Sequence, residues 1–337
     1  MVLDRLEHPI VQAPMGGGPS TPALAAAVAD AGGLGFLAAG YRPVEAVRAD
    51  AEAMKDQLFG VNLFAPPGSA TGDVGPFSAA LQPEADRYGA PVGEPRHDDD
   101  AWEAKLALMA ELRVPVVSFT FGCPPADVLA ALPGETWLTV TTPAEARAAA
   151  AAGADALVVQ GVEAGGHRGS FDDGAPGEIG LLALLQLVRD AVDLPLVATG
   201  GISTGRGVAA VLAAGAAAAQ LGTAFMLCPE AATAPAHRDA IASDGDTALT
   251  RAFTGRTARG VVNRWMREHG RDAPSAYPDV HHVTAKIRAA AREQGDPDGF
   301  HLWAGQAHRL AVAEPAGDLV RRLAAEARAA LRAAAER

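Results

Sequence analysis

The chain has 337 residues, 49% of them hydrophobic, and a formal net charge of −12. This composition supplies a large core, and the length fits one barrel of about 250 residues plus an additional subdomain. The acidic balance argues against nucleic acid or an anionic membrane surface as a partner, although a local site can still bind a small anion. Cys123 and Cys228 form no CxxC pair, and the first nine residues hold no apolar signal segment, so we expect a cytoplasmic protein without a membrane segment.

Short apolar runs alternate with Ala/Leu-rich segments between residues 10 and 221. Runs without polar alternation are typical of parallel strands that are buried on both faces. Helices between them have clear N-terminal signals at Thr21-Pro22, Pro43 and Thr142-Pro143. Eight such units predict an α/β fold, a TIM (β/α)8 barrel, rather than an open doubly wound sheet. The predicted strands are Ile10–Ala13, Leu34–Leu37, Val61–Phe64, Val116–Phe119, Trp137–Val140, Ala156–Gln160, Leu196–Thr199 and Ala218–Leu221.

Two regions interrupt this alternation. Residues 65–100 are rich in Pro and Gly and predict a long excursion after the third strand. We expect residues 1–225 to form the barrel and residues 226–316 to form a cap or lid subdomain near the active site. The last segment, 317–337, is predicted to be a helix that packs on the barrel, because Leu319, Leu323 and Ala327 share one face.

Glycines follow the seventh and eighth predicted strands. Gly200 and Gly201 end one strand, and Gly222 and Thr223 follow Gln220 at the end of the next. In a TIM barrel the active site lies at the carboxyl ends of the strands, and the loops after strands seven and eight often bind phosphate at a helix N-terminus. One such loop alone would equally suit a tight turn, but two in consecutive units favour a phosphate site.

Other strand ends carry residues that suit the body of a nucleotide-like ligand. We expect Ala13 and Met15 to flank a flat ring, and Asn62, Thr139 and Gln160 to form hydrogen bonds with its edge. Together with the phosphate loops, this arrangement favours flavin mononucleotide (FMN). The predicted cofactor-binding residues are Ala13, Pro14, Met15, Gly16, Asn62, Thr139, Gln160, Gly165, Gly200, Gly201, Gln220, Gly222 and Thr223.

The segment 160–169, Gln-Gly-Val-Glu-Ala-Gly-Gly-His-Arg-Gly, places one histidine among four glycines directly after the sixth strand. Histidine changes its protonation near neutrality, so we expect His167 to act beside the ring; the alternative is a structural histidine bonded to a carbonyl. Glu163 either orients a partner group or is solvated. No HExxH occurs and His281-His282 lack ligand spacing, so no metal is expected.

These residues resemble the nitronate monooxygenase family, formerly called 2-nitropropane dioxygenase, which are flavin-dependent TIM barrels. The resemblance covers nearly the whole chain, and its most specific motif is the glycine-histidine segment. The matching segments are Gln12–Gly17, Ala27–Gly35, Phe59–Asn62, Val117–Gly122, Gln160–Gly169, Thr199–Ile202, Gln220–Thr223, Tyr277-Pro278 and Leu302–Gln306.

The resemblance implies FMN-dependent oxidation of alkyl nitronates, and also of nitroalkanes, by O2 to carbonyl compounds and nitrite. It implies that His167 is catalytic and that Tyr277 reaches into the substrate pocket; Thr139 stands where some relatives have a lysine. The expected partners are a small nitronate and O2. The resemblance leaves open whether His167 acts as a base or binds an anion, and whether the last helix packs within one chain or in a homodimer.

Two alternatives remain at this point. An NAD(P)H-dependent flavin reductase, acting on quinones or enoyl thioesters, would share the phosphate site and a similar histidine segment. A protein that binds a phosphate-bearing ligand without turnover would share only the phosphate site.

Overall fold

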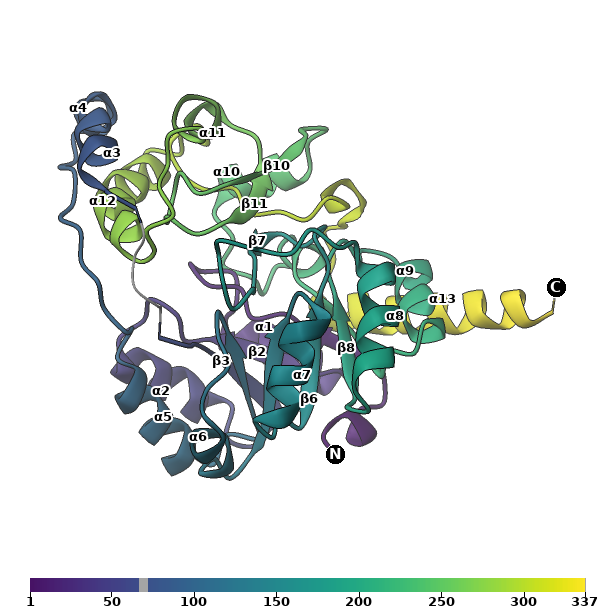
Figure 1. The fold of residues 1–337 in the computed structure, drawn as a ribbon. Coiled ribbons are helices and arrows are strands. Elements are labelled where there is room, and N and C mark those ends of the chain that lie inside the picture. Colours follow the sequence, from purple (N-terminus) through teal and green to yellow (C-terminus); the bar gives the residue numbers. More distant parts are fainter. Residues whose placement is uncertain (67–71, 337) are drawn as a thin grey trace.

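The computed structural model describes residues 1–66 and 72–336 (Figure 1). Eight parallel strands form a barrel in the order β1-β9-β8-β6-β5-β4-β3-β2, and a bridge between Val11 and Leu34 joins the first strand to the segment before the second. The predicted TIM barrel and its eight strands are therefore confirmed. Their bounds are β1 Ile10–Gln12, β2 Gly35–Ala38, β3 Phe59–Phe64, β4 Val116–Thr120, β5 Glu135–Val140, β6 Ala156–Gln160, β8 Leu196–Thr199 and β9 Ala218–Leu221.

Helices surround the barrel, and two of them begin where the sequence predicts. The hydroxyl groups of Thr21 and Thr142 accept hydrogen bonds from the N–H groups of Leu24 and Glu145, at 3.0 and 3.1 Å. These bonds satisfy N–H groups that a helix terminus leaves without an internal partner. The helices of the barrel are α1 Pro22–Asp30, α2 Val44–Ala53, α5 Trp102–Glu111, α6 Ala126–Ala130, α7 Pro143–Ala151, α8 Leu181–Ala191 and α9 Gly205–Ala213.

The barrel interior changes from apolar to polar toward the carboxyl ends of the strands. Nearer the amino ends of the strands, Trp137, Val158 and Val197 belong to one buried cluster. Side chains alternate with a period of two along a strand, so the next inward positions are two residues further along. Those positions form a buried polar layer, which consists of Asn62, Thr139, Gln160, Thr199 and Gln220.

A second hydrophobic cluster lies in the cap, and the excursion of residues 65–100 contributes to it. Phe77 and Leu81 from this excursion pack with Trp265 and Ile287. Figure 1 shows the two short helices of the excursion beside α12; residues 67–71 lie outside the described part. The elements involved are α3 Gly75–Ala80, α4 Gln82–Tyr88, α10 Pro235–Ile241, β10 Thr247–Thr250, β11 Ala258–Val261, α11 Arg264–His269 and α12 Asp279–Glu293.

The final helix, α13 Ala316–Ala335, packs on α9 and α1. Leu319, Leu323 and Ala327 are buried in the same cluster as the barrel helices, and the helix continues beyond the body of the molecule (Figure 1). Arg337 lies outside the described residues. Within the described residues, no helix combines the length and apolarity that a membrane span requires.

Three strands were not predicted, β7, β10 and β11. β7 (Gly166–His167) pairs antiparallel with β11, and β11 pairs with β10, so the three strands form a small second sheet. His167 therefore lies in a short strand within the glycine segment that follows the sixth barrel strand. The backbone of His167 pairs with Ala258, so the residue is held between the barrel and the cap.

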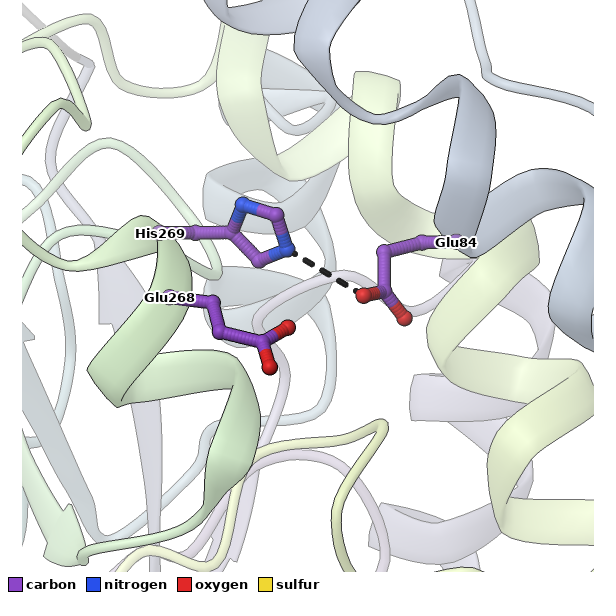
Figure 2. Close-up of side chains that lie close together, drawn as sticks. All are labelled: Glu84, Glu268 and His269. Carbon is purple, nitrogen blue, oxygen red and sulfur yellow. Dashed lines mark hydrogen bonds and ion pairs between the residues drawn. The ribbon is translucent and has the colours of Figure 1, made fainter.

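Charged residues connect α4 to α11 (Figure 2). The carboxylate of Glu84 is buried and lies 3.3 Å from His269 Nε2, and the three side chains of Glu84, Glu268 and His269 lie close enough to consider a metal ion. The guanidinium of Arg264, however, donates to both oxygens of Glu84 at 2.5 and 2.8 Å and to Glu268 at 2.5 Å. Arg264 thus supplies the positive charge that these carboxylates require, and the cluster is an ion-pair network.

Replacing Glu84 by Gln should lower the thermal unfolding midpoint by several degrees near pH 7. Burial raises the pKa of Glu84, but hydrogen bonds from Arg264 and His269 outweigh it and hold the pKa below its ordinary value. The ionised carboxylate therefore stabilises the fold above its unfolded pKa, and this contribution is lost as the pH falls through the folded pKa. Removing one partner of a buried pair costs about 3 kcal/mol.

Glu268→Gln is the matched control, because Glu268 contacts the same arginine but its side chain is half exposed. An exposed pair contributes less than about 1 kcal/mol, so this variant should unfold near the wild-type temperature. Equal midpoints for the two variants, or a Glu84→Gln effect that does not diminish as the pH is lowered through the acid range, would contradict the assignment.

Candidate active site

A cavity of about 400 Å³ lies between the carboxyl ends of the strands and the cap. A volume of this size suits a small-molecule or cofactor ligand. The structure places all predicted cofactor-binding residues, and His167, on its wall. Tyr277 is the exception: it lines a small adjoining cavity together with Tyr41 and Phe64.

The polar layer of the barrel forms the floor of the cavity. Asn62 Nδ2 donates to Ser118 Oγ at 2.9 Å and to Thr120 Oγ1 at 3.0 Å. Thr120 Oγ1 also lies 3.4 Å from Thr139 Oγ1. Since the amide N–H groups of Asn62 point to β4, its carbonyl oxygen is the atom that can accept a hydrogen bond from a ligand.

Gln160 and Arg168 fix the segment that carries His167. Gln160 Oε1 accepts bonds from Arg168 Nη1 and from the N–H of Gly169, both at 2.9 Å, and Gln160 Nε2 donates to the carbonyl of His167 at 3.1 Å. The guanidinium of Arg168 is fully buried and also donates to the carbonyls of Gly161 and Gly177. These bonds determine the orientation of the Gln160 amide. One N–H of Nε2 donates to the carbonyl of His167, and the second N–H takes no part in these bonds.

His167 is electrically neutral in this environment. Burial, followed by the positive charge of Arg256, lowers the pKa of the imidazole to about 3; Arg288 lowers it further and Asp173 opposes them. Its Nε2 lies 2.9 Å from Thr254 Oγ1. A neutral imidazole carries one lone pair, so the ring can accept a proton but does not present a cation to an anion.

Aromatic rings surround His167. The ring centroids of Phe121 and Trp303 lie 5.5 and 5.6 Å from that of His167. Phe121 adopts a φ of +81°, a left-handed conformation that is uncommon for a bulky residue, and Arg256 lies over its ring at 4.1 Å. Strained backbone of this kind persists where the surroundings hold it, and it often marks a ligand site.

The glycine loops after β8 and β9 present backbone N–H groups to the cavity. Gly200 and Gly201 have φ of +122° and +68°, and a Cβ on Gly201 would lie 2.9 Å from that of Glu163. Among the described residues, the N–H groups of Gly201, Ile202 and Gly222 donate to no protein acceptor. Such a concave set of amides is suited to an anion such as phosphate.

Two N–H groups at the start of α9 already have protein partners. At the start of α9, the N–H of Gly205 donates to Glu326 at 3.0 Å and that of Gly207 to Thr204 at 3.2 Å, so these groups are already satisfied. After β9 the chain forms a three-residue 3-10 helix, Thr223–Phe225, rather than a longer helix. The free amides at these strand ends are therefore those of Gly201, Ile202 and Gly222, which lie in the loops.

Glu163 has a structural role. Both of its carboxylate oxygens lie 3.0 Å from the N–H of Leu181, the first residue of α8. A carboxylate at a helix N-terminus satisfies a free N–H and interacts favourably with the helix dipole. Neither sequence-based interpretation, a group that orients a catalytic partner or a solvated side chain, describes this helix cap.

Tyr277 lies behind the cavity wall. Its ring centroid is 5.4 Å from that of Phe121 and 6.2 Å from that of His167, and its half-buried ring lies beside that of Tyr41. Tyr277 thus packs against Phe121 near His167, and its contact with a substrate stays a prediction. His281 stacks on Tyr41 with centroids 3.9 Å apart and does line the cavity.

Several cavity residues carry chemistry that the sequence analysis did not assign. Arg288 and Arg292 come from one face of α12, and His301 lies between them. Their spacing of four residues was the available signal, because it places both on one side of a helix. Thr233 has a buried hydroxyl with no partner among the described residues, and it faces the same cavity.

Comparison with known proteins identifies close relatives. A family model described as nitronate monooxygenase matches residues 2–326. The chain is 42% identical to a nitronate monooxygenase of Pseudomonas aeruginosa, across 96% of this chain and 97% of that protein. The solved structure of nitroalkane oxidase from Streptomyces ansochromogenes is similar with a TM-score of 0.96 and 51% identity, covering 99% of each chain. FabK from Thermotoga maritima is similar with a TM-score of 0.79 and 26% identity, covering 99% of this chain and 97% of that one.

The family match and the Pseudomonas relative both extend over nearly the whole chain, so they include the barrel, the glycine-histidine segment and the cap. The chain therefore belongs to the nitronate monooxygenase family of flavin-dependent oxidoreductases, which act on nitronates.

Proposed function

We propose that this protein uses FMN and O2 to oxidise alkyl nitronates, and the nitroalkanes from which they form, to carbonyl compounds and nitrite. The observation that carries the proposal is a neutral, half-buried His167 on the wall of a cavity that is also lined by glycine loops with free amides. The nitroalkane oxidase of Streptomyces ansochromogenes supports the nitroalkane branch of the proposal.

The residues of the cavity fit FMN. The free N–H groups of Gly201, Ile202 and Gly222 suit its phosphate, and the unpartnered Thr233 hydroxyl offers a further contact. Asn62 and Gln160 are placed to form hydrogen bonds with the polar edge of a flat ring, and Met15 to contact its face. When bound, FMN supplies the electron-accepting and oxygen-dependent chemistry.

The protein's own groups prepare the substrate. His167 accepts the proton from the carbon that bears the nitro group of a neutral nitroalkane, since its ring is uncharged above a pKa of about 3. The rings of Phe121 and Trp303 pack next to the ring of His167. A substrate that arrives as a nitronate has already lost this proton and does not need the base.

The direct test is an absorption spectrum of the purified protein with FMN, followed by measurement of nitrite release from a series of nitronates in air. Flavin absorbance with nitrite release supports the proposal. Anaerobic mixing with NADH distinguishes the reductase alternative, because rapid loss of flavin absorbance would favour a flavin reductase. Colourless protein that takes up no FMN would favour a binding protein without turnover.

His167→Ala should lower kcat/KM for a neutral nitroalkane by about 10²- to 10⁴-fold, because a positioned base contributes that much. Turnover of the corresponding nitronate should fall much less, and FMN binding should not change. His237→Ala is the control, since His237 is another neutral cavity histidine whose Nε2 bonds the carbonyl of Trp303. Equal losses with nitroalkane and nitronate would show that His167 does not act as the base.

The rate with a neutral nitroalkane should stay nearly constant between pH 8 and pH 5. Burial and Arg256 lower the pKa of His167 to about 3, so the base form persists throughout this range and is lost only as the pH falls toward that value. The measurement is kcat/KM against pH with the FMN-loaded enzyme. A titration near pH 6.5, the ordinary value for histidine, would contradict the neutral, desolvated ring.

Gly201→Ala should weaken FMN binding at least about tenfold, measured by quenching of flavin fluorescence. The added Cβ would lie 2.9 Å from that of Glu163, and the φ of +68° strains any residue with a side chain. Gly153→Ala is the matched control: Gly153 also has a positive φ, +93°, but no atom lies within 4 Å of its added Cβ. Unchanged FMN affinity in Gly201→Ala would exclude this loop from the phosphate site.

A further inference from the structure

The cap face of the cavity carries two arginines on one helix, of which Arg288 is buried and Arg292 is half-buried. Arg288 and Arg292 lie four residues apart on α12, and Ala285 and Ala289 from the same face also line the cavity. Residues with this spacing share one side of a helix. The small alanine side chains leave space in front of the two guanidinium groups.

Neither arginine has a carboxylate partner in the described part of the chain. Arg288 donates to Thr284 Oγ1 at 2.9 Å and to the carbonyl of His281 at 3.1 Å. Arg292 donates to the carbonyl of Gly17 at 3.3 Å and lies over the ring of Phe300. Burial lowers the pKa of Arg288 to about 10 and also lowers that of Arg292, so both remain cations near neutrality. Buried charges are normally paired, so this pair lacks a counter-ion.

The ring of His301 lies between the two guanidinium groups and contacts both. Its Nδ1 lies 3.1 Å from Arg288 Nη1, and its Nε2 lies 3.2 Å from Arg292 Nη2. Burial and the two arginines lower the pKa of His301 well below its usual range, so the ring is neutral. A neutral imidazole accepts at one nitrogen only, and a guanidinium only donates. One of the two arginines therefore directs an N–H at this ring without an acceptor.

The pair is connected to the catalytic residue by stacked and tilted rings. His301 stacks on Trp303 with centroids 5.0 Å apart, and Trp303 lies 5.6 Å from His167. The charge of Arg288 is near enough to lower the pKa of His167. A small ligand in the cavity can thus meet His167 at one end and the arginines on the cap side.

We propose that Arg288 and Arg292 form an anion-binding site on the cap face of the cavity, which receives a negatively charged pair of oxygens on the substrate. The identity of the substrate rests on the proposed function. Two sources share this chemistry, namely the nitronate group itself and a carboxylate elsewhere on the same molecule. In either case the arginines supply the positive charge that the neutral His167 does not.

Butanoate is a suitable unreactive probe, because a carboxylate spreads one negative charge over two oxygens as a nitronate does. Its dissociation constant is measured by calorimetry on the FMN-loaded protein. Arg292→Met should raise this constant about 10- to 100-fold, since hydrogen bonds to charged groups contribute that much. Arg288→Lys keeps the positive charge but loses the bidentate hydrogen bonding of a guanidinium to a carboxylate. It should therefore weaken binding less than Arg292→Met does.

Lys286→Met is the matched control. Lys286 lies on the same helix but is exposed, so the variant removes the same charge from the solvent side. It should bind butanoate within about twofold of wild type, because exposed charges are screened. Sulfate should compete with butanoate in the wild type. This measurement does not depend on whether a variant folds.

Steady-state rates identify the source of the charge. The nitronates of 1-nitrobutane and 4-nitrobutanoate are compared with wild type and Arg292→Met. Loss of substrate binding raises KM while kcat changes little. An increase with both substrates assigns the site to the nitronate group, and an increase only with the second assigns it to the carboxylate.

The proposal is overturned if Arg292→Met and Arg288→Lys bind butanoate as wild type does, or if sulfate does not compete. Its failure differs from failure of the proposed function. If neither substitution changes nitrite release, the proposed nitronate oxidation stands and the anion site is rejected. If butanoate binding depends on the arginines but no nitronate yields nitrite, the anion site stands and the proposed oxidation is rejected.

Discussion

The short pairing of β7 with β11 holds the site together. His167 follows a barrel strand in sequence, but its backbone belongs to a sheet whose other strands lie in the cap. The N–H of Arg168 continues this attachment by donating to the carbonyl of Thr257 at 2.8 Å. On the barrel side, Gln160 bonds the carbonyl of His167. His167 is thus fixed from two directions, and movement of the cap relative to the barrel would displace it.

The electrostatics of the cavity depend on desolvation and on buried arginines, whose charge Asp173 only partly opposes at His167. Burial lowers the pKa of His167, His237 and His301, so three histidines that would titrate near neutrality in water are neutral here. Arginines carry the positive charge instead, because their intrinsic pKa is high enough to keep them protonated after the same desolvation. A neutral base beside fixed cations suits the removal of a proton that leaves a negative charge on the substrate.

The barrel and much of the site could be predicted because their determinants are local. Strands buried on both faces are continuous apolar runs, and Thr-Pro pairs mark the starts of α1 and α7. In a barrel of parallel strands, every carboxyl end faces the same side, so strand-end residues such as Asn62, Gln160 and Gly201 meet without any knowledge of their contacts. Tyr277 comes from the cap, where this rule does not apply, and its placement required the structure.

Sequence alone determined the eight β/α units, the glycine loops, and a histidine after the sixth strand, since periodicity and backbone freedom are properties of short segments. Tertiary structure decided what those residues face. It paired His167 with β11, used Glu163 as a helix cap, and brought Arg288 and Arg292 to the cavity without a carboxylate. Charge state follows from burial and from neighbours distant in sequence, so the neutral His167 and its cationic surroundings appear only when the chain is folded.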